Sequence, residues 1–89
     1  MKPLFIVSVL SESAFVISFE QKIDEQINDF VLFLHRQFTK SPFHGFVESV
    51  PAYASLTIYF DLIKLKKTPQ QTTEIFVKEY VEKIIENNL

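Results

Sequence analysis

The sequence contains no cysteine and one glycine, and each scarcity excludes a class of site. Without cysteine there is no disulfide framework, no thiolate zinc site and no thiol nucleophile. The single glycine, Gly45, argues against phosphate-cradling loops, which need several glycines where the backbone approaches the ligand. An excess of positive charge is also missing, because the net charge is −2. Nucleic-acid-binding domains usually carry a basic patch, so no nucleic-acid partner is expected.

Long hydrophobic runs are absent as well. The apolar stretch at residues 4–10 is far shorter than the roughly 20 residues of a transmembrane helix. It follows Lys2 and precedes small residues, a pattern shared with signal peptides. Its β-branched and aromatic residues favour the other interpretation, a buried strand. We therefore expect a cytoplasmic protein with no membrane partner.

The sequence is rich in apolar and aromatic side chains. Its 89 residues, with a mass of 10.4 kDa, suffice for a single domain, 1–89. Hydrophobic residues make up 47% of the chain, and ten residues are Phe. Such a chain can bury enough apolar surface to offset the entropy lost on ordering, which excludes intrinsic disorder.

Four apolar runs are predicted to be strands. They span residues 4–10, 14–19, 46–50 and 55–60. The polar link 11–13 between the first two runs is typical of a hairpin turn. Pro51 has no N–H group and belongs at the end of a strand.

Two amphipathic helices complete the pattern. The first is predicted to begin after Asp24 as its N-cap and to end before Pro42. The second is predicted to begin at Thr68 as the cap, with Pro69 in the first helical position and Gln71 completing a capping box. Their apolar stripes recur at spacings of three and four residues, and consist of Ile27, Phe30, Val31, Leu34 and Phe38, and of Phe76, Val77, Tyr80, Val81, Ile84 and Ile85.

This order predicts an α+β fold with a two-layer ββαββα arrangement. A four-stranded antiparallel sheet would carry both helices on one face. A sheet face open to water should show polar residues in alternation, yet the first two strands are apolar on both sides. We therefore expect the uncovered face to meet another domain, another subunit or a second copy of the chain. The alternative is that sheet twist and the end loops cover it.

No arrangement of residues predicts a self-contained active site. His35 borders the first helical stripe and His44 lies in a loop, so both are expected to be ordinary residues rather than metal ligands. No Gly-x-Ser-x-Gly elbow is present, so no nucleophile–base pair is assigned. Two charge clusters remain. The acidic residues Asp24, Glu25 and Asp29 lie at a predicted helix start, where capping explains them. The basic residues Lys64, Lys66 and Lys67 could bind a phosphate, but three lysines in a connector are a weak signal.

The most unusual stretch is the predicted second hairpin. Glu48 is an acid in an apolar strand, and Tyr53 and Ser55 place two hydroxyl groups beside the rigid Pro51-Ala52 turn. One interpretation is a well-formed turn whose hydroxyls satisfy local backbone groups. The functional interpretation is a polar corner that binds a partner or ligand through Glu48, Pro51, Ala52, Tyr53 and Ser55.

This stretch also carries a family resemblance. The run Glu48-Ser49-Val50-Pro51-Ala52-Tyr53-Ala54-Ser55-Leu56, with Gly45 upstream, resembles the N-terminal domain of the KipI-like family, also described as allophanate hydrolase subunit 1 or as the B subunit of 5-oxoprolinase. Two positions depart from the family pattern: Ser11-Glu12 stands where the family usually has Gly-Asp, and Leu62 follows Asp61 where the family has Pro. Family subunits continue into a cyclophilin-like barrel, which these 89 residues do not include.

The resemblance implies a ββαββα domain that works with a KipA-like companion subunit. Such complexes resemble ATP-dependent amide-ring hydrolases that act on 5-oxoproline, with the chemistry in the barrel domain and the partner. We therefore expect a non-catalytic assembly domain without its own cofactor or metal, ATP being bound elsewhere in the parent complex. The alternative implied by the resemblance is a regulatory module that inhibits a sensor histidine kinase. Self-association through the open sheet face is a further expectation.

Overall fold

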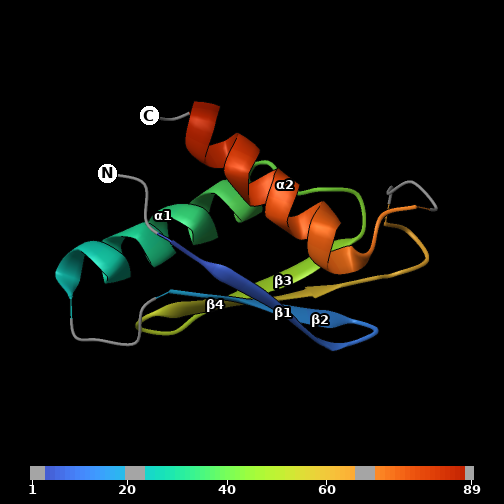
Figure 1. Ribbon diagram of the computed structural model, residues 1–89, viewed down its shortest axis with the longest axis horizontal. Coiled ribbons are helices and arrows are strands. Elements are labelled where there is room, and N and C mark those ends of the chain that lie inside the picture. Colours follow the sequence, from blue (N-terminus) through green and yellow to red (C-terminus); the bar gives the residue numbers. More distant parts are fainter. Residues whose placement is uncertain (1–3, 20–23, 66–69, 88–89) are drawn as a thin grey trace.

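The computed structural model describes residues 4–19, 24–65 and 70–87 (Figure 1). The predicted α+β class and the ββαββα order are confirmed, and every strand agrees with its prediction to within two residues at each end. The elements are β1 (Ile6–Ser11), β2 (Ala14–Ser18), α1 (Glu25–Lys40), β3 (Phe46–Pro51), β4 (Ser55–Phe60) and α2 (Thr73–Asn87).

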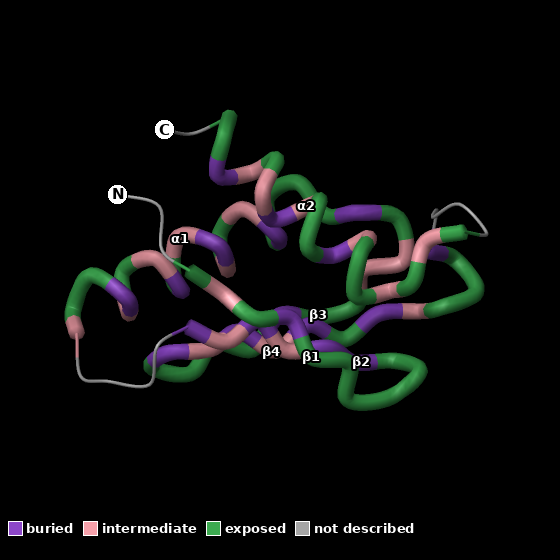
Figure 2. Tube along the Cα trace, in the orientation of Figure 1, coloured by how far each residue is buried: buried purple, intermediate pink, exposed green. Residues whose placement is uncertain are grey.

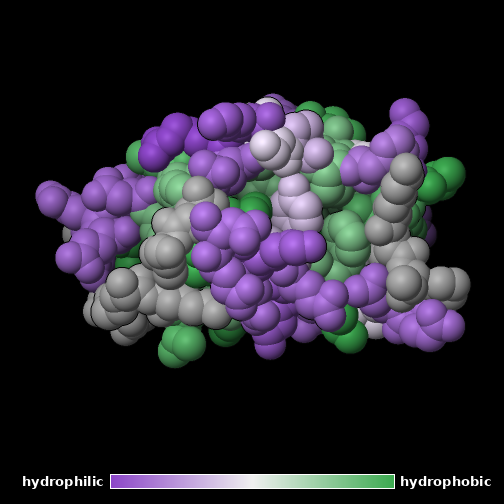
Figure 3. Space-filling model, turned by 90° about the horizontal axis from the view of Figure 1, so that it is seen from above, coloured by the Kyte–Doolittle hydropathy of each residue, from purple (hydrophilic) through white to green (hydrophobic). Residues whose placement is uncertain are grey.

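The four strands form one antiparallel sheet in the order β1-β2-β4-β3. Both helices lie on the same face of this sheet, as Figure 1 shows, with α1 packed mainly on β3 and β4 and α2 on β1. The core fills the space between the two layers, where the buried positions of Figure 2 face one another. Seen from the helix side, hydrophilic side chains cover much of the surface (Figure 3).

The start of α1 agrees with the prediction. Asp24 is extended, and its carboxylate accepts a hydrogen bond from the Gln26 N–H at 2.9 Å. The helix buries a single stripe against the sheet, made of Ile27, Val31, Leu34 and Phe38. An N-cap of this kind stabilises a helix by about 1 kcal/mol.

The predicted start of α2 is wrong. The helix begins at Thr73, and the cap is Thr72, whose Oγ1 accepts from the Ile75 N–H at 3.1 Å. Gln71 donates its side-chain amide to Glu79 at 2.9 Å and completes no capping box. Thr68 and Pro69 lie outside the described residues. The segment 68–72 contains no apolar residue besides its proline, so a helical turn there would bury little against the sheet to offset its ordering cost.

An aromatic cluster joins both helices to the sheet. Phe43, in the loop after α1, lies 5.7 to 6.1 Å from the ring centroids of Phe38, Phe46, Phe76 and Tyr80. Ring pairs at these separations add about 0.5–1.5 kcal/mol each beyond the area they bury. The cluster therefore explains how so small a domain holds its two helices in place.

The outer face of the sheet is only partly apolar. Ser8, Val16, Thr57 and Val50 form one row of cross-strand partners on this face, in which polar and apolar residues alternate. Val16 and Thr57 are half-buried, whereas Val50 is exposed. The continuous apolar surface expected from the sequence is therefore interrupted by hydroxyl side chains, and the exposed apolar residues lie toward the two edges.

Candidate functional site

The candidate residues from the sequence lie on the hairpin formed by β3 and β4. Glu48 lies within β3, Pro51 ends that strand, Ala52 and Tyr53 form the turn, and Ser55 begins β4. Glu48 is paired across the hairpin with Tyr59, four residues beyond Ser55. Four residues of strand span about 13 Å, so the structure divides the predicted site into two parts.

The first part is the turn at the end of the hairpin, which is held by hydrogen bonds to backbone groups. The Ala52 N–H donates to the Ser55 O at 2.8 Å and closes the turn. The Phe19 N–H donates to the Ala54 O at 2.9 Å, which ties the turn to the segment after β2. The Asn28 side-chain amide donates to the Tyr53 O at 3.3 Å, which ties it to α1. The turn is therefore a rigid element fixed at three points.

The side chains of this turn are nonetheless directed to solvent. Pro51, Ala52 and Tyr53 are exposed, and Tyr53 retains 44% of its surface. Ala54 is buried, at 7% exposure, and Ser55 is half-buried. The turn can therefore present a rigid aromatic and proline surface to another macromolecule.

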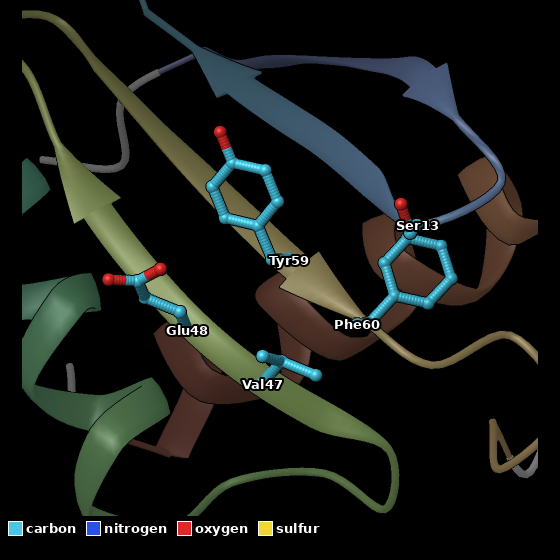
Figure 4. A pocket seen from close by; sticks show the side chains of 5 residues that line it. All are labelled: Ser13, Val47, Glu48, Tyr59 and Phe60. Carbon is cyan, nitrogen blue, oxygen red and sulfur yellow. The ribbon is translucent and has the colours of Figure 1, made fainter.

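The second part is a shallow pocket at the other end of the hairpin (Figure 4). It has a volume of about 340 Å³ and is lined by Ser13, Val47, Glu48, Tyr59 and Phe60. A bulge in β3 between Phe46 and Glu48 places Val47 at its exposed wall. The Glu48 carboxylate and the Tyr59 hydroxyl lie on the same face of the sheet in Figure 4, as their cross-strand pairing requires. These groups can accept or donate hydrogen bonds to a ligand or a partner side chain.

Sequence reasoning did not find Ser13, Val47, Tyr59 or Phe60 as neighbours of Glu48. The signal that could have found Tyr59 is the hairpin register. Four residues connect the Pro51–Leu56 pair, and counting back along both strands places Glu48 opposite Tyr59. The bulge and the approach of Ser13 depend on the neighbouring strand and have no local signal in the sequence.

A serine and a histidine meet on the helix side of the sheet. The Ser49 Oγ lies 2.9 Å from the His35 Nδ1, which joins β3 to α1. This is the distance of a nucleophile–base pair, but Ser49 is only 8% exposed and lies beneath the helix layer. The pair links α1 to the sheet. His35 is half-buried, and His44 is exposed.

Metal binding finds no support in the residues that the structure describes. Among them, no group of three or more His, Asp or Glu side chains is placed to hold a metal ion.

No helix in the described ranges is long and apolar enough to cross a bilayer.

One further backbone feature supports the hairpin. Gly45, just before β3, has a φ of 101° and accepts a hydrogen bond from the Asp61 N–H at 2.7 Å, just after β4. The Asp61 carboxylate in turn accepts from the Ile63 N–H at 3.0 Å. Gly45 and Asp61 thus close the hairpin at the end opposite the Pro51 turn.

Comparison with known proteins agrees with the resemblance carried by the hairpin. Residues 5–88 match the family model described as carboxyltransferase domain, subdomain C and D. The chain is 34% identical over 84 residues to the B subunit of 5-oxoprolinase from Bacillus subtilis (strain 168), and the match covers 93% of this chain but 34% of that protein. The chain therefore spans about a third of the length of this relative.

Two solved structures have the same fold. One is the N-terminal domain of the histidine kinase inhibitor KipI from Bacillus subtilis, with a TM-score of 0.77 and 33% identity over 98% of this chain and 89% of that one. The other is the uncharacterized protein PH0987 from Pyrococcus horikoshii, with a TM-score of 0.73 and 34% identity over 92% of this chain and 37% of that one. The resemblance to KipI-like proteins and to the 5-oxoprolinase B subunit is thereby confirmed, and the chain belongs to the family of the carboxyltransferase domain, subdomain C and D.

Proposed function

We propose that this domain is a non-catalytic assembly domain of a 5-oxoprolinase-type subunit, which docks on a KipA-like companion subunit in the cytoplasm. ATP and the amide-ring hydrolysis of 5-oxoproline belong to the parent complex in this proposal. The similarity to the 5-oxoprolinase B subunit supports it, because in that relative the matching region is one part, about a third, of a longer subunit.

The observation that carries the proposal is the distribution of polar groups. The one serine–histidine pair seen at hydrogen-bond distance in the described residues is buried under α1. The exposed groups, Glu48, Tyr53 and Tyr59, lie on a hairpin held at both ends by backbone hydrogen bonds. A rigid surface with an exposed tyrosine suits recognition of another protein, since such a side chain loses little entropy on binding.

Binding of the 89-residue chain to the purified KipA-like companion, measured by calorimetry, tests the proposal. Tyr53→Ala is expected to weaken binding roughly tenfold, in the range of tyrosine hot spots. Ile75→Ala is the matched control, because Ile75 is 46% exposed on α2 whereas Tyr53 is 44% exposed on the turn. Absence of binding, or equal effects of the two variants, would contradict the docking role of the turn.

Hydrolysis of 5-oxoproline by the chain alone with ATP is the second measurement. No turnover is expected, because Ser49 is only 8% exposed. Turnover that disappears in Ser49→Ala would show that the domain is itself catalytic and would overturn the proposal.

A second candidate function is inhibition of a sensor histidine kinase. The similarity to the N-terminal domain of a histidine kinase inhibitor over 98% of this chain favours it. Autophosphorylation of a sensor kinase, measured with and without the chain, separates the two candidates. No inhibition and no binding reject this second function and leave the first in place.

A further inference from the structure

The two edges of the sheet differ in how they are protected. β3 forms one edge and carries the Glu48 carboxylate, the bulge at Val47 and Pro51, which has no N–H to donate. These are features that keep an edge strand from pairing with another chain. β1 forms the other edge, and its six residues, IVSVLS, include neither a charge nor a proline. Its own bulge, between Val9 and Ser11, lies at the end of the strand and leaves residues 6–9 in regular pairing. Figure 2 shows most of this strand exposed.

Hydrogen bonds at both ends of the β2–β4 pairing establish which peptide groups face which neighbour. The Phe60 N–H donates to the Ser13 O at 2.9 Å, and the Phe19 N–H donates to the Ala54 O at 2.9 Å. Both pairs continue the β2–β4 register. Because alternate residues of an antiparallel strand face opposite neighbours, odd-numbered residues of β2 face β4 and even-numbered residues face β1.

The same alternation shows which backbone N–H and C=O groups of β1 do not face β2. Val16 of β2 is paired with Ser8, so the peptide N–H and C=O groups of Ser8 face β2. Those of Val7 and Val9 face away from the sheet. No strand of the described chain lies beyond β1, so two N–H donors and two C=O acceptors line this edge.

We propose that β1 pairs antiparallel with β1 of a second copy of this chain, about a twofold axis that passes beside Ser8. In this register Val7 of each copy lies opposite Val9 of the other. There are two such Val7–Val9 pairs, and each exchanges two backbone hydrogen bonds. Four hydrogen bonds therefore join the two four-stranded sheets into one sheet of eight strands. Ser8 faces Ser8 of the second copy in a pair that exchanges no hydrogen bonds.

The side chains of β1 match this register. Beyond the two valine pairs, Ile6 of one copy meets the bulge at Leu10 of the other, and these residues are 69% and 60% exposed in the single chain. Val9, at 47% exposure, also gains cover at the same edge. No like charges meet, because β1 has none, and cross-strand apolar pairs stabilise such an interface.

Sedimentation and light scattering of the isolated chain over a range of concentrations test the proposal. We expect a concentration-dependent dimer that Ser8→Lys weakens about fivefold or more, since two ammonium groups then face each other across the axis. Ser8 is exposed, so its replacement leaves the single chain folded, which circular dichroism checks. Val50→Lys, which adds the same charge to an exposed position of the opposite edge strand, is the control and should leave the dimer intact.

Mixing two variants tests the register directly. Ser8→Lys and Ser8→Glu should each dimerise poorly alone and should form a mixed dimer together. A chain that stays monomeric at millimolar concentration overturns the proposal, and so does a dimer that resists Ser8→Lys or dissociates with Val50→Lys. Since these measurements use no companion subunit, their failure leaves the proposed docking function untouched, and failure of that docking leaves the dimer standing.

Discussion

Replacement of Gly45 by alanine tests the backbone geometry on which the candidate hairpin depends. Gly45 has a φ of 101°, a conformation that L-amino acids with a side chain rarely adopt. A Cβ atom at this position would lie 2.9 Å from the Asp61 O and 3.3 Å from the Leu65 N. Both neighbours are backbone atoms, so neither can move aside without displacing the segment that follows β4.

The expected loss has two parts. Holding a non-glycine residue in a sparsely populated region costs about 1–3 kcal/mol. Moving the Asp61 backbone away from the new Cβ also weakens the 2.7 Å hydrogen bond from the Asp61 N–H to the Gly45 O, and such a bond contributes about 0.5–1.5 kcal/mol. We expect Gly45→Ala to lower the free energy of unfolding by about 2–4 kcal/mol in total.

Urea unfolding followed by circular dichroism measures this loss. A domain of this size has a total stability of roughly 4–13 kcal/mol, so the loss is a large share of it. At about 4–8 °C per kcal/mol, the melting temperature should also fall by at least about 8 °C. His44→Ala is the control, because His44 is the exposed neighbour of Gly45 and carries no positive φ. If Gly45→Ala unfolds at the wild-type urea concentration, the positive φ and the close approach to Asp61 do not constrain the hairpin, and the reasoning is refuted.

Three further variants test single contacts. Ser49→Ala leaves the His35 Nδ1 without its partner and should cost about 1–2 kcal/mol of unfolding free energy, which urea titration measures; no cost would mean that water replaces the serine. Tyr80→Phe removes the hydrogen bond from the Tyr80 hydroxyl to the Ser41 O at 2.8 Å and should cost about 1 kcal/mol. Burial raises the pKa of Tyr80, so the wild-type chain should lose stability as the pH rises above about 10, where tyrosine ionises in the unfolded chain, and Tyr80→Phe should lose less; equal pH dependence would contradict this. Thr72→Ala should cost about 1 kcal/mol in thermal unfolding and Thr72→Ser almost nothing, unless the Thr72 hydroxyl does not cap α2.

The sequence predicted the fold wherever a local pattern and the tertiary packing agree. The strand at 55–60 was predicted at its observed bounds, and Asp24 was correctly identified as the N-cap of α1. The start of α2 was misplaced because Thr68 and Thr72 both offer a capping hydroxyl. The apolar stripe that packs on β1 begins only after Thr72, whereas residues 68–72 contain no apolar residue besides Pro69.

The site was less predictable, since its contacts join distant elements. His35 and Ser49 are fourteen residues apart and meet because α1 crosses β3, a packing that no local pattern encodes. Glu48 was identified as unusual, but its pocket needs Ser13 from the β1–β2 turn. The expectation of an apolar outer face failed in part because residues from four strands alternate across it, while each strand was judged alone.

The structure gives residues of the Val50–Leu56 run a role in the fold. Pro51 ends an edge strand, where the missing N–H leaves no ladder bond unmade. Ala54 is buried in the core cluster, so a larger side chain there would press on its neighbours. Its carbonyl accepts a hydrogen bond from the Phe19 N–H. Pro51 and Ala54 therefore serve the fold of this run. Within it, Tyr53 has the large exposed side chain, and substitutions there separate a role in recognition from a role in folding.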